Sequence, residues 1–271
     1  MKVFILAPAR LDRFQVRVLD SLAQDPRIEL VGACIDTRPE RTKVSKLRRD
    51  LRKGRGGYVA VKAVNALLHR TWLPVQTAAE LFESEGVPFL PTDDLYGEET
   101  LDYIRSRSPD CLVRGGFGII REPILSLAPK GVLSYHHGNI RRYRGTPVGF
   151  WELLHGEREL SVTVQRLVPA LDAGPIVREL TVPIFPGDSW RSVEKRAYAV
   201  SDRLLLEACL LVERDDFTPE RVPEEELGAL YTEPNLRQWS SLQARVGARK
   251  LRRVLRGESS STGQEQLPRS S

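Results

Sequence analysis

The stretch GVLSYHHGNIRRYRGTPVGFWELLHGERELSVTVQRLV, residues 131–168, predicts a strand, a helix and a second strand in succession. Residues 131–138 and 161–168 are short runs rich in apolar and β-branched side chains, which is typical of buried strands. Residues 147–157 between them carry apolar side chains at helical spacing. The pattern indicates one unit of a sheet that is covered by helices.

The same alternation continues on both sides of this stretch. Amphipathic helices are predicted after the first strand and at residues 97–106, and one long helix is predicted from Ser189 to Glu213 with Asp188 as its N-cap. Strands alternating with helices predict an α/β fold, an open, mostly parallel, Rossmann-like sheet with helices on both faces. The other strands are predicted at residues 3–8, 30–36, 85–91 and 109–118, with extended edge structure at 175–185.

Three further segments do not fit this alternation. Nearly fifty residues separate the second and third strands, so we interpret 38–75 as a basic helical insertion in a catalytic domain of residues 1–212. Residues 213–256 are predicted to be a linker and a basic C-terminal extension. The polar end, residues 257–271, is predicted to be disordered.

The composition of the 271 residues is that of a globular protein, with 41% hydrophobic and 28% charged residues. No apolar run approaches the roughly 18 residues that a membrane-spanning helix needs, and the apolar start of the chain is too short for a signal peptide. Cys34, Cys111 and Cys209 show no CxxC spacing, which argues against a disulfide framework. We therefore expect a cytoplasmic protein.

The net charge of +5 comes from 41 Lys and Arg against 36 Asp and Glu, and many of the cations lie in residues 38–55 and 245–256. Two solvated helical faces are the simplest explanation; a phosphate-bearing substrate, an RNA backbone or an anionic membrane surface are alternatives. No aromatic residues alternate with these cations to stack on bases. We expect the basic segments to serve substrate binding or self-association into a homodimer rather than nucleic acid.

The loop after the first strand, APARLDRF, contains neither GxGxxG nor GxxxxGK[ST]. The glycines of those motifs let the backbone approach a pyrophosphate closely. NAD-dependent redox chemistry and P-loop hydrolysis are therefore poor interpretations.

Polar side chains gather after two of the predicted strands. Ser134, His136 and His137 end the first strand of the quoted stretch, and Asp172 follows the second. Loops at the ends of neighbouring strands face one crevice, so Asp172 can hold the His136 ring and favour its protonated form. A buried core histidine and a turn-capping aspartate are the structural alternative. Adjacent strand residues point to opposite faces, which disfavours zinc binding by the two histidines.

Residues 131–177 resemble the central block of the folate-dependent formyltransferases. That family shows Asn-x-His-Pro-Ser, then a Tyr-Arg-Gly turn, a helix, a strand and Leu-Asp-x-Gly-Pro-Ile. The matching features here are His136, the turn at 143–145 and the run LDAGPI at 171–176. The resemblance extends over residues 1–212, apart from 38–75.

The resemblance implies transfer of the formyl group of 10-formyltetrahydrofolate to an amine, with His136 and Asp172 as catalytic residues. Negative charge develops on the formyl oxygen, and a protonated imidazole can donate to it. Ser134 stands where the family has an asparagine, the second donor to that oxygen, and we assign it as the third catalytic residue because its hydroxyl can also donate one hydrogen bond. Loss of one such donor typically costs about 10²–10³ in rate.

The resemblance also implies a folate site formed mostly by backbone groups, which small residues leave accessible. We assign to it Gly115, Gly116, Phe117, Gly118, Ile119, Ala170 and Leu171. We assign contacts with the acceptor to His137, Asn139, Arg144 and Gly145.

Three known classes of enzyme in the family fit this sequence poorly. Too few residues follow Glu213 for the C-terminal β-barrel of methionyl-tRNA formyltransferases, the first loop lacks the glycines of glycinamide ribonucleotide formyltransferases, and the regulatory domain of the deformylases is absent. The expected acceptor is an amino sugar nucleotide or the amine of a specialised metabolite, with a phosphate as one recognition element. A non-catalytic folate-binding or partner-binding protein and a methionyl-tRNA formyltransferase-like enzyme are the alternatives.

Overall fold

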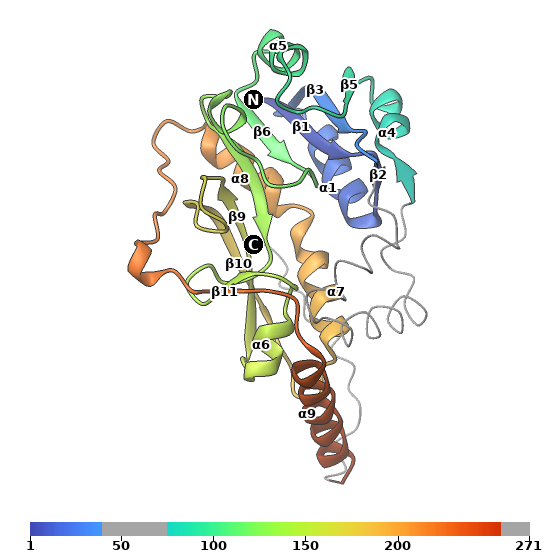
Figure 1. Ribbon diagram of the computed structural model, residues 1–271, viewed down its shortest axis with the longest axis vertical. Helices are drawn as coiled ribbons and strands as arrows, with labels where there is room; N and C mark the ends of the chain where they lie inside the picture. The colour runs from blue at the N-terminus through green and yellow to red at the C-terminus, as the bar shows by residue number, and fades with distance from the viewer. Residues whose placement is uncertain (40–74, 256–271) are drawn as a thin grey trace.

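The structure, a computed structural model, describes residues 1–39 and 75–255 (Figure 1). Its centre is a seven-stranded sheet in the order β10-β9-β7-β6-β1-β3-β5, in which β9 and β10 run antiparallel to their neighbours and the other pairs are parallel. The predicted open, mostly parallel sheet is confirmed. The strands are β1 (Lys2–Pro8), β3 (Glu29–Asp36), β5 (Phe89–Thr92), β6 (Cys111–Arg114), β7 (Val132–His136), β9 (Glu159–Arg166) and β10 (Ile176–Pro183).

Helices cover both faces of this sheet, because its central strands are apolar on both sides. In β1, Val3 and Ile5 belong to one core and Phe4 and Leu6 to the other, and all four are fully buried. The first core also contains residues of α1, α4, α7 and α8, and the second contains residues of α5. The helices are α1 (Arg13–Ala23), α4 (Ala78–Ser84), α5 (Glu98–Ser106), α6 (Phe150–His155), α7 (Trp190–Ser201), α8 (Leu204–Glu213) and α9 (Leu236–Leu255).

The single helix expected from Ser189 to Glu213 is wrong, since α7 ends at Ser201 and α8 begins at Leu204. The hydroxyl of Tyr135 lies between the two helices, where it donates to the Ser201 carbonyl and accepts from the Leu205 N–H at 3.2 Å. That hydroxyl takes the place of the direct backbone bond that would continue the helix, and an inserted side chain of this kind breaks the helical hydrogen-bond pattern.

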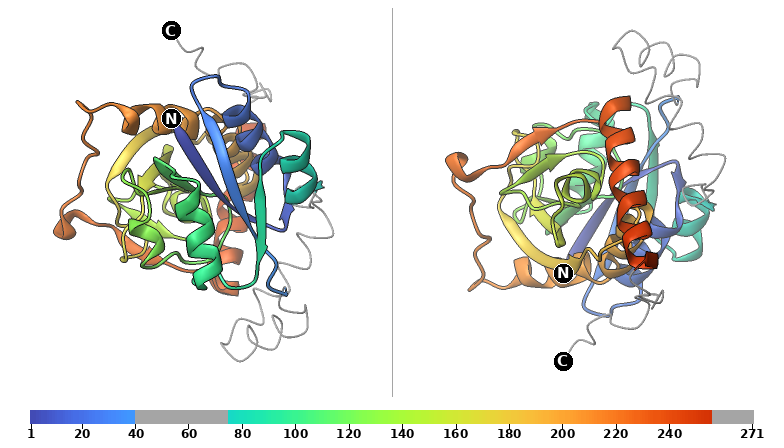
Figure 2. Two further views of the ribbon diagram at one scale, coloured as in Figure 1. Left: turned by 90° about the horizontal axis from the view of Figure 1, so that it is seen from above. Right: turned by 90° about the horizontal axis from the view of Figure 1, so that it is seen from below.

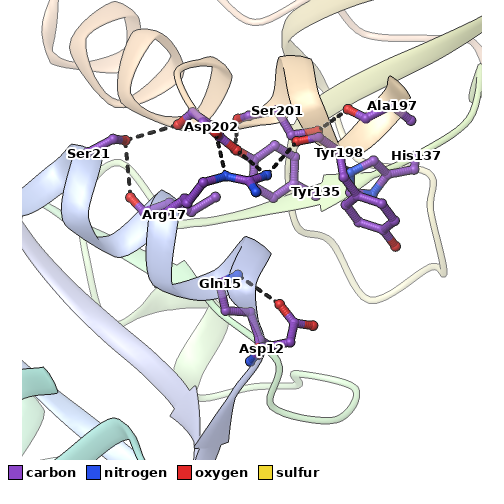
Figure 3. Close-up of polar contacts among 11 residues, drawn as sticks. Asp12, Gln15, Arg17, Ser21, Tyr135, His137, Ala197, Tyr198, Ser201 and Asp202 are labelled. Carbon is purple, nitrogen blue, oxygen red and sulfur yellow. Dashed lines mark hydrogen bonds and ion pairs between the residues drawn. The ribbon is translucent and has the colours of Figure 1, made fainter. Parts of the chain in front are cut away.

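Contacts from α1 also hold this break (Figure 3). The Arg17 guanidinium donates to both carboxylate oxygens of Asp202, at 2.7 and 3.0 Å, and the Ser21 hydroxyl donates to the Asp202 carbonyl at 2.9 Å. The predicted N-cap of α7 is also wrong. Ser189 caps the helix, whereas Asp188 forms an ion pair with Arg196 at 2.9 Å.

Two small sheets accompany the main one. β8 (Tyr143–Gly145) pairs in parallel with β11 (Ala229–Tyr231), which the sequence did not predict, and β2 (Arg10–Leu11) pairs with β4 (Gln76–Thr77). The last helix, α9, lies beside α6 (Figures 1 and 2). The rings of Phe150 in α6 and Trp239 in α9 stack, with their centroids 5.6 Å apart.

Two segments of the expected domain organisation lie wholly or mostly outside the residues that the structure describes. Apart from residues 38, 39 and 75, the predicted insertion lies outside the described residues, as does the polar tail at 257–271. Within residues 1–39 and 75–255, no helix is both long and apolar enough to cross a membrane.

Candidate active site

A pocket of ≈ 390 Å³ lies at the carboxyl ends of β6 and β7. Its walls come from the ends of those strands, from Ile119 and Ile120, from the loop 167–172 and from residues 230–233 at the end of β11. Its size is within the usual range of small-molecule sites, and it lies where open α/β sheets bind ligands.

His136 is buried at the base of the pocket with both ring nitrogens engaged. Nε2 lies 2.7 Å from the carbonyl oxygen of Tyr143, and Nδ1 lies 3.5 Å from a carboxylate oxygen of Asp172. A carbonyl only accepts, so Nε2 carries a hydrogen and donates it. Gly138 makes this close packing possible, because a Cβ there would lie 2.7 Å from Nε2.

Asp172 reaches the histidine from a left-handed backbone conformation with φ of 46°, which aspartate tolerates better than most residues. Its carboxylate accepts the Gly145 N–H at 2.9 Å and the Gln165 side-chain amide at 3.3 Å. These donors aim the carboxylate at His136. The carboxylate thereby faces Nδ1 of the His136 ring across 3.5 Å.

His137 points to the opposite face of β7, as expected for an adjacent strand residue. Its ring packs against Tyr135 and Tyr198, with centroids 5.3 and 4.6 Å away (Figure 3). Burial lowers the pKa of His137 to about 3, so the ring is neutral. The Ser201 hydroxyl donates to the Ala197 carbonyl, and Nε2 of His137 lies 3.1 Å from that hydroxyl. His137 still lines one edge of the pocket.

The other residues assigned from the sequence are distributed unevenly. Ile119, Ala170, Leu171 and Gly145 line the pocket. Gly115, Gly116 and Gly118 do not, and the Phe117 ring is buried in the core of the sheet.

Asn139 and Arg144 also lie outside the pocket lining. Asn139 accepts the Arg141 N–H in a local turn at 2.9 Å, and Arg144 donates to the Gly228 carbonyl at 2.7 Å. Both side chains have structural partners at these positions.

In the part of the chain that the structure describes, no three His, Cys, Asp or Glu side chains are grouped as metal ligands are.

The family model for formyl transferases matches residues 68–209, just over half of the 271 residues. The matched region contains β6, β7 and β9 together with His136 and Asp172. This chain belongs to the formyl transferase family.

The curated relatives of this chain share only part of their length with it. A methionyl-tRNA formyltransferase of Thermotoga neapolitana is 33% identical over 135 residues, which make up 49% of this chain and 42% of that protein. The chain spans about half the length of the curated relatives it matches.

Solved structures of two formyltransferases share the fold. The phosphoribosylglycinamide formyltransferase from Anaplasma phagocytophilum has a TM-score of 0.56 and 16% identity, covering 86% of this chain and 99% of its own. The N-formyltransferase from Helicobacter canadensis has a TM-score of 0.55 and 10% identity, covering 91% and 80%.

The chain departs from the pattern expected for the family at Ser134, whose side chain is buried beside His136. The Ser134 hydroxyl donates to the Tyr135 carbonyl at 3.4 Å and accepts from Nη1 of Arg114 at 3.2 Å. Burial lowers the pKa of Arg114, while the nearby Asp172 carboxylate opposes that change. An arginine remains charged at neutral pH even so.

Three parts of this site were not identified from the sequence. They are Arg114, residues 230–233 at the end of β11, and Gln165, which donates to the Asp172 carboxylate. The one available signal for Arg114 was a charge that ends the apolar run CLV at 111–113. Residues 230–233 gave no such signal, because their place depends on the pairing of β11 with β8.

Proposed function

We propose that this protein transfers the formyl group of 10-formyltetrahydrofolate to an amine of a small molecule. The observation that carries the proposal is the His136–Asp172 pair, held at 3.5 Å in a pocket at the carboxyl ends of the strands. The region of the family match contains both residues.

In this reaction the lone pair of the amine forms a bond to the formyl carbon, the bond from that carbon to the folate nitrogen breaks, and the amine proton ends on that nitrogen. The Asp172 carboxylate is suited to accept the amine proton, since it faces the pocket as a base. His136 shares its Nδ1 hydrogen with that carboxylate and stabilises negative charge nearby. Apolar side chains of Ile119, Ile120 and Leu167 supply walls that suit a flat ring system.

We propose an amino sugar nucleotide or a specialised metabolite amine, with or without a phosphate, as the acceptor. The pocket lining includes Glu233, a second carboxylate besides Asp172 that suits a ligand bearing an amine. The N-formyltransferase from Helicobacter canadensis, which covers most of this chain, was crystallised with folinic acid and dTDP-3-aminofucose. Cys34, Cys111 and Cys209 are free, in keeping with a reducing, cytoplasmic setting.

Methionyl-tRNA is a second candidate acceptor, because the curated relatives with 30–33% identity are methionyl-tRNA formyltransferases. The two acceptors predict different behaviour with salt. Binding of tRNA weakens steeply as salt rises, since phosphate contacts release counterions, whereas binding of a small acceptor depends on salt far less.

The test is incubation with 10-formyltetrahydrofolate and, separately, methionyl-tRNA, nucleotide-linked amino sugars and simple amines. Tetrahydrofolate release and the formylated acceptor are measured together. His136→Ala and Asp172→Asn should each lower kcat by roughly 10²–10⁴-fold and leave tetrahydrofolate affinity unchanged. Asp216→Asn, at a fully exposed carboxylate, is the matched control and should behave as wild type. Unchanged turnover in His136→Ala refutes the mechanism.

Binding without turnover by any acceptor would instead support a folate-binding protein that does not transfer formyl groups. Sedimentation of the same sample tests the proposed homodimer.

A further inference from the structure

Arg114 lies at the end of β6, beside the end of β7. The two strands are parallel, with Leu112 opposite Val132 and Val113 opposite Leu133, and this register brings Arg114 next to Ser134. Residues two apart on a strand share a face, so His136 lies on the same side as Ser134. The guanidinium and the imidazole therefore border one pocket from neighbouring strands.

Most hydrogen-bond donors of this wall are already committed. The Nε2 hydrogen of His136 goes to the Tyr143 carbonyl, and the hydroxyl hydrogen of Ser134 goes to the Tyr135 carbonyl. The other ring nitrogen of His136, Nδ1, faces the Asp172 carboxylate at 3.5 Å. Each N–H or O–H of these groups therefore already faces an acceptor of the protein, and none is free to donate to a ligand.

Arg114 is different, because a guanidinium has five N–H bonds. Nε donates to the carbonyls of Phe117 and Gly118, at 2.7 and 2.8 Å, and one hydrogen of Nη1 goes to Ser134. Among the residues that the structure describes, Nη2 has no hydrogen-bond acceptor. Three N–H bonds thus remain on a side chain that lines the pocket.

The same contacts fix the guanidinium in position. Its Nε is held by two loop carbonyls and its Nη1 by Ser134, so few rotamers remain open to it. Donors that are held in advance stabilise developing charge without the cost of reorganisation. A cationic donor also stabilises an oxyanion more than a neutral amide does.

We propose that Arg114 is a catalytic residue that donates to the formyl oxygen as negative charge develops on it, with Ser134 as the positioning residue that orients the guanidinium. The inference rests on the proposed formyl transfer. The neutral donor that the family places at position 134 is then replaced by a charged donor from the adjacent strand, and the short serine leaves room for it.

The first test compares Arg114→Met, Arg114→Lys and Arg121→Met in the full chain by tetrahydrofolate release with the best acceptor. Arg114→Met should lower kcat by about 10²–10³-fold with unchanged tetrahydrofolate affinity, as for loss of an oxyanion donor. Arg114→Lys keeps the charge but not the planar fork and should fall between wild type and Arg114→Met. Arg121, an exposed arginine outside the pocket, is the control and should keep full activity.

The second test separates donation from a structural role. Guanidinium ion added to Arg114→Ala should restore part of kcat, and Ser134→Asn should raise kcat in the Arg114→Met background by supplying an amide. A purely structural arginine predicts neither rescue. Circular dichroism identifies a variant that fails to fold, in which case Arg114→Lys and its kcat decide the question.

Two failures are distinguishable. If the wild type releases no tetrahydrofolate with any acceptor, the proposed function is overturned and this inference with it. If the wild type transfers formyl groups and Arg114→Met keeps its kcat, or neither rescue occurs, the role of Arg114 alone is overturned.

Discussion

Replacing Glu152 by glutamine removes the charge of a carboxyl group that is buried in α6. The side chain is 4% exposed, and its Oε1 has no hydrogen-bond partner among the described residues. Burial raises the pKa of Glu152 from 4.5 to about 7, and the nearby Glu157 carboxylate adds to the effect. Between pH 4.5 and about 7 the folded protein therefore holds a proton at Glu152 more often than the unfolded chain does.

The effect on stability follows from that difference. Between pH 4.5 and 7 the unfolded chain binds fewer protons at this position than the folded protein does, so the free energy of unfolding falls as pH rises. The difference between the two pKa values corresponds to about 3 kcal/mol, reached once the pH exceeds about 7. Below pH 4.5 the carboxyl group is protonated in both states and contributes nothing.

Urea denaturation of wild type and Glu152→Gln at pH 4.5 and pH 8 measures this. The two proteins should differ little at pH 4.5, and the variant should be more stable by about 3 kcal/mol at pH 8. Glu224→Gln, at an exposed glutamate, controls for the change of residue type and should show no such dependence. A stability difference between wild type and Glu152→Gln that is equal at both pH values would refute the reasoning.

Three further changes test the fold. Tyr135→Phe removes the hydroxyl that joins α7 to α8 and should lower the free energy of unfolding by about 1–3 kcal/mol in urea denaturation; no change would mean that the helices close directly. Gly174→Ala places a Cβ 2.0 Å from the Arg166 carbonyl oxygen, so its melting temperature should fall sharply. Gly247→Ala meets no atom within 4 Å in α9 and should instead stabilise the protein by up to about 1 kcal/mol, as a calorimeter can measure.

The strands of the sheet could be predicted because burial of a strand requires apolar residues within that strand itself, and these can be read from the sequence. The run at 3–8 is uninterrupted and the run at 30–36 is nearly so, since the central residues of β1 and β3 are buried on both faces. The break between α7 and α8 leaves no signal in the residues of the two helices. The apolar spacing continues through it, and the interruption comes from Tyr135 and Arg17, which are distant in the sequence.

The candidate site could likewise be predicted only in part. His136 and Asp172 follow strands that the sequence identifies, so their proximity could be expected, and the structure brings them to 3.5 Å. The position of Phe117 could not, because whether a loop side chain enters the core or the pocket depends on packing. Arg114 was missed because a single charge at a strand end is common on protein surfaces, and its burial appears only in three dimensions.

Gly145 contacts two parts of the pocket that lie far apart in the sequence, Asp172 and the strand β11. Its N–H holds Asp172, and its Cα lies so close to β11 that a Cβ would come within 2.0 Å of the Tyr231 carbonyl oxygen. Residues 230–233 lie after the family match at 68–209, yet they close one wall of the pocket. We therefore expect that a change of residues 230–233 alters which ligand the pocket accepts. His136 and Asp172 should keep their positions in such a variant, provided that position 145 stays glycine.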